Sequence, residues 1–329
     1  MGLRRAESRE LRDMEQDLEL YEKVHIAWLY YMENLTQSEI ADRLGLTRLM
    51  VHRTLQKCLQ EGLVHIVINH PLMYCQSLGS QLESVFGLKS AWVIPTSPDY
   101  EVLRRNLGTI AARLVGRAVA SGTIVGVGWG TTLAEVARHL LRKSHDNVTV
   151  VSLLGGLIKS AGNNSYEVAL QVADALDAVC YSYMAPMFVE SAEDRDAILR
   201  LRHIQAVQDL IRRASVAIVG VGEVSADCTL ARMGPLSAAD VDSLLKAGAV
   251  ADILGNFIDK NGQLVEVDVN QRVLTTDLEE LKEIDNVFAV TGGLKKAQAI
   301  SAALRSGCID NIITDAQTAE QVLQLNRPF

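Results

Sequence analysis

From Leu18 to Leu35, apolar side chains recur every three or four positions, which predicts one helix with a strongly buried face. The elements expected after it are two shorter helices over 37–44 and 48–61, a short strand over Leu63–Ile68 and a hinge at Asn69-His70-Pro71. Residues 1–17 are polar with charges of both signs, so we expect a frayed arm or a solvated helix there.

Beyond the hinge, the pattern changes to short β-branched runs that alternate with helical stretches. The predicted strands are 91–94, 123–127, 148–154, 179–184, 216–221, 287–290 and 312–314. The predicted helices are 77–86, 101–120, 132–142, 166–178, 204–213, 238–247 and 296–306. Apolar strands separated by helices indicate a parallel sheet that is covered on both faces. The predicted fold class is therefore α/β, with a doubly wound domain after a smaller helical one.

The composition is that of a globular protein with a large core. Hydrophobic residues make up 48% of the chain, and no apolar run is long enough to cross a membrane. The charged N-terminus lacks the apolar segment of a secretory signal, so we expect a cytoplasmic protein with no membrane partner. The five cysteines are scattered and form no C-x-x-C pair, which predicts buried thiols and no metal site.

A helix–turn–helix signature follows the first helix. Thr36 and Glu39 have the spacing of a capping box, which places a helix start at Gln37. Gly45 suits a tight turn, and Thr47 can cap the next helix. The predicted apolar faces of the two helices are Ile40, Ala41 and Leu44, and Val51, Leu55 and Leu59. In this motif the second helix enters the major groove of DNA, and the strand after it would make the domain winged-helix-like.

The charge distribution favours contact with DNA only locally. The chain has 32 Lys+Arg and 40 Asp+Glu, a net charge of −8, which argues against DNA binding by its whole surface. Residues 43–57 contain four cations and no acid, so this window carries +4 and the remainder −12. A helical hairpin with a solvated basic face would give the same window, but the caps and the glycine turn favour DNA binding. The predicted DNA-binding residues are Thr36, Gln37, Thr47, Arg48, Met50, His52, Arg53 and Lys57.

These DNA-binding candidates have different expected roles. Arg48 and His52 lie near the start of the second helix, with Arg53 one turn further, where side chains face base edges. Thr47 and Lys57 are expected to contact phosphate. Met50 either packs against a thymine methyl group or belongs to the core.

Glycine-containing stretches follow four of the predicted strands, namely GVGWGTT (126–132), LGGL (154–157), GVG (220–222) and TGGL (291–294). Ligands of open α/β sheets bind at the carboxyl ends of strands, where backbone N–H groups and helix N-termini favour anions. Gly130-Thr131-Thr132 opens a helix and is suited to a phosphate. The G-x-G-x-G spacing and the missing acid after the next strand argue against NAD, and there is no Walker motif, so no cofactor is predicted.

Two charged residues are candidates for the same site. Asp252 lies in the apolar run GAVADILG, so its carboxylate is expected to be partly buried. It would either accept hydrogen bonds from ligand hydroxyls or serve as a capped or salt-bridged structural residue. Lys296 begins the helix after Thr291-Gly292-Gly293, a position where a cation is unfavourable unless an anion lies nearby.

Together these motifs resemble the SorC family of bacterial transcriptional regulators, also called SorC/DeoR-type sugar-binding regulators. The resemblance extends over nearly the whole chain, from about Lys23 to Phe329. It rests on the segments 35–63, GVGWGTTL (126–133), AGAVADILGNFID (247–259), NQRV (270–273), AVTGGLKKAQAISAAL (289–304) and NIITD (311–315).

The resemblance implies an arm (1–17), a helix–turn–helix DNA-binding domain (18–70) and an effector-binding and oligomerisation domain (71–329). The last is similar to the sugar-phosphate isomerase/deaminase fold but acts as a sensor. By this resemblance, Gly130 and the two threonines hold an effector phosphate, while Asn164 and Asp252 contact the sugar. The effector-binding residues that we expect are Gly128, Gly130, Thr131, Thr132, Gly155, Gly156, Asn164, Gly222, Asp252 and Lys296.

The sequence departs from the family pattern in three places. Ala251 stands where the family usually has glycine, and Trp129 is bulky for its loop. Residues 159–164 bring few cations that could meet a second phosphate. The expected effector is therefore a sugar monophosphate, or a free sugar or polyol.

These inferences predict a regulator of a carbohydrate or polyol catabolic operon. It would act as a repressor or an activator and would not be an enzyme. It would bind double-stranded operator DNA as a homo-oligomer, a dimer or a tetramer like most of the family. The alternative is a sugar-phosphate isomerase or aminosugar deaminase with an added N-terminal domain. In that case Asp252 or Glu223 would act as the base.

Overall fold

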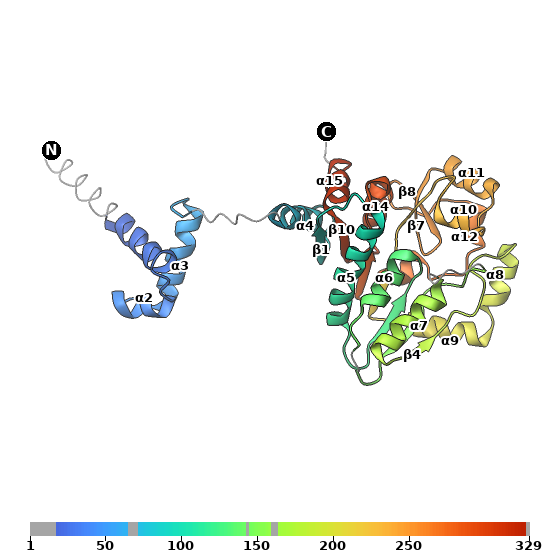
Figure 1. Ribbon diagram of the computed structural model, residues 1–329, viewed down its shortest axis with the longest axis horizontal. Coiled ribbons are helices and arrows are strands. Elements are labelled where there is room, and N and C mark those ends of the chain that lie inside the picture. Colours follow the sequence, from blue (N-terminus) through green and yellow to red (C-terminus); the bar gives the residue numbers. More distant parts are fainter. Residues whose placement is uncertain (1–17, 65–71, 143–144, 159–163, 327–329) are drawn as a thin grey trace, which may run out of the picture. The chain divides into compact units, whose positions relative to one another are not determined.

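The computed structural model describes residues 18–64, 72–142, 145–158 and 164–326 (Figure 1). The chain divides into two compact units, Met1–Asn69 and His70–Phe329, here called the N-terminal and C-terminal units. Among the described residues, one hydrophobic cluster belongs to the first unit and two belong to the second. The predicted arm, residues 1–17, lies outside the described residues.

The described part of the N-terminal unit consists of a helix over residues 18–31, followed by α2 (Gln37–Leu44) and α3 (Arg48–Gln60). The predicted capping box is present, because the Thr36 hydroxyl accepts from the Glu39 N–H and the Glu39 carboxylate accepts from the Thr36 N–H. Gly45 ends α2 with φ +67°, a left-handed conformation that favours glycine. Thr47 then caps α3 by accepting from the Met50 N–H.

The three helices share a small core, formed by Ile26, Ala27, Leu29, Ile40, Ala41, Val51, Leu55 and Cys58. The prediction for Leu59 was wrong, because its side chain is 41% exposed. Cys58 takes the core position instead, since it follows Leu55 by three residues and so returns to the buried face of α3. The first helix was predicted to reach Leu35 but ends earlier, at residue 31. Of the predicted strand over 63–68, the described residues Leu63 and Val64 are not in a strand, and the rest lies outside the described residues.

The C-terminal unit is built on a seven-stranded parallel sheet, and all seven predicted strands are present. In chain order they are β1 (Ser90–Ile94), β2 (Ile124–Val127), β3 (Thr149–Ser152), β4 (Val179–Tyr181), β5 (Val216–Val219), β9 (Asn286–Val290) and β10 (Asn311–Asp315). Their order across the sheet is β1-β10-β9-β5-β2-β3-β4. β4 ends at Tyr181, three residues before the predicted end.

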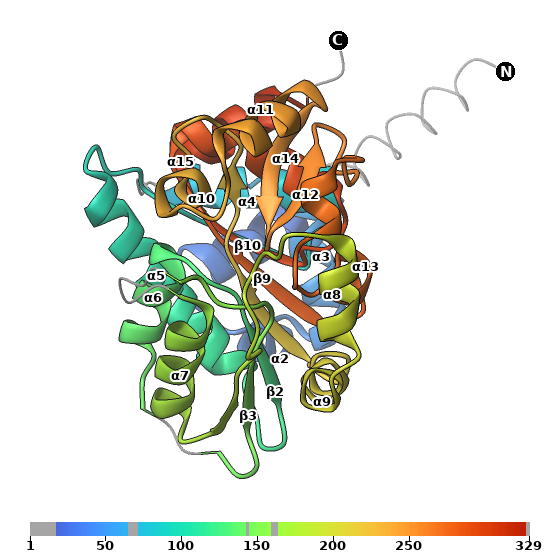
Figure 2. The same ribbon diagram turned by 90° about the vertical axis from the view of Figure 1, so that its right-hand side faces the viewer.

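Helices cover both faces of this sheet (Figure 2). One face carries α5 (Tyr100–Ala118), α6 (Thr131–His139) and α7 (Ser165–Leu176). The other carries α4 (Leu72–Phe86), α8 (Ala192–Leu199), α9 (Arg202–Ile211), α14 (Ala297–Arg305) and α15 (Ala316–Gln324). Neighbouring strand residues such as Ala217 and Ile218 belong to different clusters, because successive side chains of a strand point to opposite faces. Most strand positions are therefore apolar.

A second, three-stranded sheet was not predicted. It consists of β6 (Gly222–Glu223), β7 (Ala249–Ile253) and β8 (Asn256–Asp259), and its pairs are antiparallel. Leu254 and Gly255 form the β7–β8 turn with φ values of +57° and +84°. The remaining described elements are α10 (Thr229–Met233), α11 (Ala238–Lys246), α12 (Asp268–Gln271), α13 (Leu278–Lys282) and the 3-10 turn η1 (Leu294–Lys296).

Candidate functional site

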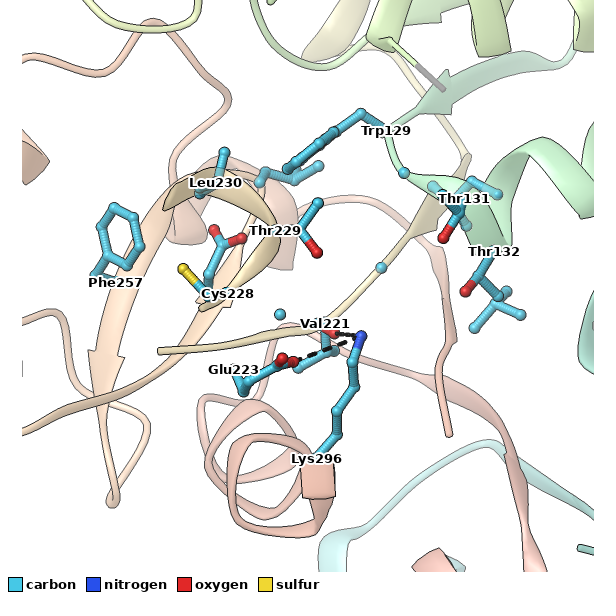
Figure 3. A pocket seen from close by; sticks show the side chains of 17 residues that line it. Trp129, Thr131, Thr132, Val221, Glu223, Cys228, Thr229, Leu230, Phe257 and Lys296 are labelled. Carbon is cyan, nitrogen blue, oxygen red and sulfur yellow. Dashed lines mark hydrogen bonds and ion pairs between the residues drawn. The ribbon is translucent and has the colours of Figure 1, made fainter. Parts of the chain in front are cut away.

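Two glycine loops and Lys296 meet at one pocket of the C-terminal unit. Strands β9, β5 and β2 are neighbours in the parallel sheet, so their carboxyl ends lie side by side. The loops after β2 and β5 contribute to the pocket, as do the last residue of β9, Lys296, the small sheet and α10 (Figure 3). The predicted stretch 291–294 is not among the lining residues. The lining residues are Trp129, Gly130, Thr131, Thr132, Leu133, Gly220, Val221, Gly222, Glu223, Cys228, Thr229, Leu230, Asp252, Leu254, Phe257, Val290 and Lys296.

The start of α6 supplies the part of the pocket that suits an anion. Gly130 precedes the helix with φ +113°, and no side chain caps its first turn. The N–H groups of that turn therefore keep the partial positive charge of a helix N-terminus. Thr131 and Thr132 add hydroxyl groups beside them (Figure 3). Gly128 does not line the pocket; a Cβ there would lie 2.9 Å from Leu254 Cδ2, so this glycine permits close packing of the loop.

Asp252 places a buried carboxylate in the pocket wall. Its side chain is 7% exposed, and its Oδ1 accepts a hydrogen bond of 2.6 Å from the Gly255 N–H. Desolvation by burial raises the pKa of this carboxyl group to about 6, against the opposing effects of the Gly255 hydrogen bond and of Lys296. Gly222 lies beside it, where a Cβ would come within 2.9 Å of Asp252 Oδ2. The expected partial burial is confirmed, and one carboxylate oxygen holds the β7–β8 turn.

Lys296 brings a cation to the same pocket. Its ammonium group donates to the Val221 carbonyl at 3.0 Å and lies 3.8 Å from Glu223 Oε2 (Figure 3). The sequence predicted an anion near Lys296, and Glu223 supplies at least part of that negative charge. The pocket combines a helix N-terminus, one ammonium group and two carboxylates around a set of hydroxyls. This arrangement suits a ligand that has several hydroxyl groups and one anionic end.

Besides Gly128, three further predicted effector-binding residues lie outside the lining of this pocket. Gly155 approaches the Pro186 carbonyl so closely that a Cβ would lie 2.4 Å from its oxygen. Gly156 packs against Tyr166. Asn164 is fully buried as the N-cap of α7, and its amide exchanges hydrogen bonds with the Leu157 backbone. Their contact with an effector stays a prediction.

The pocket-wall side chains that sequence reasoning did not select include Cys228, Thr229, Leu230 and Phe257. The first three surround the start of α10, which reaches the pocket because it follows β6. The available signal was Thr229, a hydroxyl residue at the first position of a helix shortly after a strand-end glycine loop. Phe257 has no such signal, because its place depends on the pairing of β8 with β7.

The predicted DNA-binding residues lie on the surface of the N-terminal unit. Thr36, Thr47, Arg48, Met50, His52, Arg53 and Lys57 are exposed, and Gln37 is half-buried. Met50 is 52% exposed, so the core alternative was wrong. Arg43 pairs with Glu33, whereas Arg48, Arg53 and Lys57 have no ion-pair partner among the described residues. Gln37 and Arg48, from the first turns of α2 and α3, line a shared groove.

Comparison with known proteins agrees with a ligand-binding regulator. Residues 70–324 match the Sugar-bind family of sugar-binding domains. The erythritol catabolism regulatory protein EryD of Brucella abortus is 31% identical over 90% of this chain and 94% of its own. The transcriptional regulator LsrR of Klebsiella pneumoniae is 34% identical over 91% of this chain and 92% of its own.

Solved structures add a full-length match. The sorbitol operon regulator SorC of Klebsiella pneumoniae aligns with a TM-score of 0.72 and 27% identity over 93% of this chain and 99% of its own. Fold, pocket and relatives thus define a sugar-binding transcriptional regulator. The chain belongs to the SorC family of such regulators. In the described part of the chain, no helix is long and apolar enough to cross a membrane, and no cluster of side chains is suited to a metal ion.

Proposed function

We propose that this protein binds a specific operator DNA sequence in the cytoplasm and regulates an operon for the catabolism of a carbohydrate or polyol. Residues 18–70 act as a helix–turn–helix DNA-binding domain. Residues 71–329 bind the effector and carry the oligomer contacts. The observation that carries this proposal is the pocket, which is lined by the positively polarised N-terminus of α6, by the ammonium group of Lys296 and by the buried carboxylate of Asp252.

The surface of α3 supports the assignment of the DNA-binding unit. Three cations, Arg48, Arg53 and Lys57, lie on this one helix without an ion-pair partner in the described chain. Unpaired cations are available to displace counterions from DNA phosphates. Met50 and His52 stand exposed near the start of the same helix, where a recognition helix contacts base edges.

The pocket supports a sugar or polyol, free or monophosphorylated, as the effector. The α6 N-terminus and the two threonines would receive a phosphate, as helix N-termini do. Asp252 and Glu223 would accept hydrogen bonds from hydroxyl groups. Erythritol and sorbitol, in the names of EryD and of the sorbitol operon regulator, are polyols of this kind. The bound effector would favour one of two states of the protein and so change its affinity for DNA.

The test combines a ligand screen with a DNA-binding assay. Thermal shifts of the full chain with sugars, polyols and their monophosphates identify the effector, and its influence on binding is measured with an operator selected from random double-stranded DNA. Failure to select any specific sequence, with or without ligand, would refute the proposal.

Thr132→Val tests the division of labour between the units. This change removes a hydroxyl from the pocket of the C-terminal unit. We expect a reduced effector-induced thermal shift and unchanged operator affinity without effector. Thr109→Val is the matched control, because its hydroxyl bonds to the Arg105 carbonyl within α5 and lies outside the pocket. Loss of effector-free operator binding in folded Thr132→Val protein would contradict this assignment.

A second candidate function is a sugar-phosphate isomerase or aminosugar deaminase, as the likeness to that fold suggested. The observation in its favour is that two carboxylates, Asp252 and Glu223, line one pocket and that the pKa of Asp252 is raised to about 6, near a general base's working range. Turnover of sugar phosphates by the purified protein, lost in Asp252→Asn, would establish it. Binding without turnover in the same preparation leaves the regulator as the assignment.

A further inference from the structure

Helix α5 carries a row of arginines on the side that faces away from the core of the C-terminal unit. Leu107 and Ala111 point into that core. Arg105, Arg113 and Arg117, here called the arginine face, are exposed. At ~100° per residue the three arginines fall within about 120° of the helix circumference, opposite the buried side. The helix therefore buries one side in its unit and presents guanidinium groups on the other.

The charge of the arginine face is not neutralised by neighbouring carboxylates. Residues 102–134 contain four arginines and no Asp or Glu. The fourth, Arg104, is paired with Glu101 and Glu135. The three arginines of the face have no ion-pair partner among the described residues. Three full positive charges are therefore available to a partner on one side of a single helix.

The spacing of these charges suits a phosphate backbone. Arg105 and Arg117 are twelve residues apart, which corresponds to roughly 18 Å along the helix axis. Phosphates of one DNA strand follow one another every ~3.4 Å along the duplex axis, so a strand that runs beside α5 passes about five of them. Each guanidinium group can therefore meet a phosphate of its own. All three cations are arginine, whose planar group donates two parallel N–H bonds to phosphate oxygens.

Other partners fit the arginine face less well. Two copies of the face would repel each other, because each presents cations without carboxylates. A helix that lies on an anionic membrane presents a row of large apolar side chains beside its cations. The exposed large apolar residues of α5, Tyr100 and Val102, both lie in its first turn. DNA is the polyanion that a transcriptional regulator meets. We propose that the arginine face of α5 is a second DNA contact, which binds the phosphate backbone outside the segment contacted by α3.

This contact rests on the proposed DNA binding and extends it to the C-terminal unit. Phosphates are the same at every base pair, so the arginine face adds affinity but no sequence preference. Three contacts are too few to hold DNA without α3, and the face therefore adds to the binding by the N-terminal unit. Each arginine that meets a phosphate steepens the slope of log K against log salt by about 0.9.

A salt titration of the full chain tests the second contact. The probe is a fluorescent duplex of mixed sequence, which requires neither the operator nor the effector. The double variant Arg113→Ala, Arg117→Ala is compared with Arg202→Ala, Arg213→Ala. The latter removes two exposed arginines from the two ends of α9, which covers the opposite face of the parallel sheet. Both double variants change the net charge equally, so a difference between them reports where the arginines lie.

We expect the α5 variant to bind the duplex at least about tenfold more weakly near 100 mM salt, with a slope less negative by about 2 per chain. The α9 variant should keep the wild-type affinity and slope. Thermal unfolding should be unchanged in both, because all four side chains are exposed. Equal slopes for the two double variants would overturn the proposal. A wild-type chain that binds no duplex would overturn the proposed DNA binding as well.

Photocrosslinking distinguishes DNA from an acidic protein as the partner of the arginine face. Asn106 is exposed within the same arc of α5, so Asn106→Cys carries an aryl azide label. The background is Cys180→Ser, since Cys180 is the native cysteine that is not buried. On illumination with the same duplex we expect a yield of protein–DNA crosslink at least tenfold above that of Gln205→Cys, an exposed position of α9. Equal yields would show that DNA does not lie on the arginine face.

Discussion

At the scale of single residues, the sequence was most informative where a charge interrupts an apolar run. Asp252 was predicted to be partly buried from its neighbours alone, and its carboxylate lies in the pocket wall. Its partners were not predictable, because Gly255 reaches it through a turn and Lys296 through the packing of a distant segment. The exposed cations of α3 were also predicted correctly, because the face of a helix on which a residue lies follows from its spacing to nearby residues.

Asp252→Asn should change how stability depends on pH. The folded pKa of about 6 lies above the ordinary value of 3.8, so the wild-type folded state holds this proton more tightly than the unfolded state. Its unfolding free energy should therefore fall as pH rises from about 4 to 6, by up to about 3 kcal/mol. Asparagine lacks this proton equilibrium but can still accept from the Gly255 N–H. Urea unfolding at pH 4 and pH 7, without effector, measures the difference between the two proteins; a difference that does not vary with pH would contradict the expectation.

Arg48→Ala and Lys57→Ala should weaken DNA binding in different ways. Arg48 lies in the first turn of α3, where base edges are contacted, so its loss should weaken operator binding by about 1–3 kcal/mol and alter base preference. Lys57 lies in the last turn, where phosphate is expected. Its loss should weaken binding to all DNA sequences alike and reduce the salt dependence of the binding constant. Titrations at several salt concentrations on operator and scrambled DNA measure both, and identical behaviour of the two variants would remove the base-contacting role from Arg48.

At the scale of elements, predictability followed the length and continuity of the pattern. The seven parallel strands were found because both faces of the sheet are covered and most strand positions are apolar. The three-stranded sheet was missed, because β6 has only two residues and β7 and β8 are joined by a two-residue turn. Helix α8 was missed because it buries no residue and has no apolar face to recognise.

Gly45→Ala should loosen α2 and α3 without a steric clash. The glycine has φ +67°, which costs an alanine about 1 kcal/mol, and nothing lies within 4 Å of the position of a new Cβ. Amide hydrogen exchange in the two helices should therefore become about fivefold faster, while exchange in the C-terminal unit stays the same. Gly45→Asn is the control, since asparagine tolerates this conformation better and should show a smaller effect. Equal exchange in wild type and Gly45→Ala would mean that the turn does not limit the stability of the helices.

At the scale of the whole molecule, the net charge of −8 conceals a short basic window in a chain that is otherwise acidic as a whole. The window 43–57 carries +4, and three of its four cations are unpaired in the described structure. The remaining −12 is spread over the rest of the chain. A single N-terminal unit therefore offers few phosphate contacts, which is a physical reason for several units to act on one DNA molecule. Composition alone could not reveal this window, because it averages the window with the rest of the chain.

A chain that starts at His70 should keep effector binding and lose DNA binding. The hydrophobic clusters of the C-terminal unit contain no described residue of the N-terminal unit, so its core is complete without it. We expect the effector-induced thermal shift of the shortened chain to equal that of the full chain. Calorimetry with the effector from the screen provides the affinity. A shortened chain that folds but no longer binds the effector would show that the two units share the site.

The position of β10 has a consequence for the synthesis of the protein. This strand, the last of the seven in chain order, inserts between β1 and β9 with parallel pairing on both sides. Until Asn311–Asp315 has emerged, β1 has no neighbour in the sheet and β9 presents an open edge. The N-terminal unit can therefore fold on the nascent chain, whereas the C-terminal unit must wait for its completion. Premature termination before β10 would yield a product with a complete N-terminal unit and an incomplete C-terminal unit.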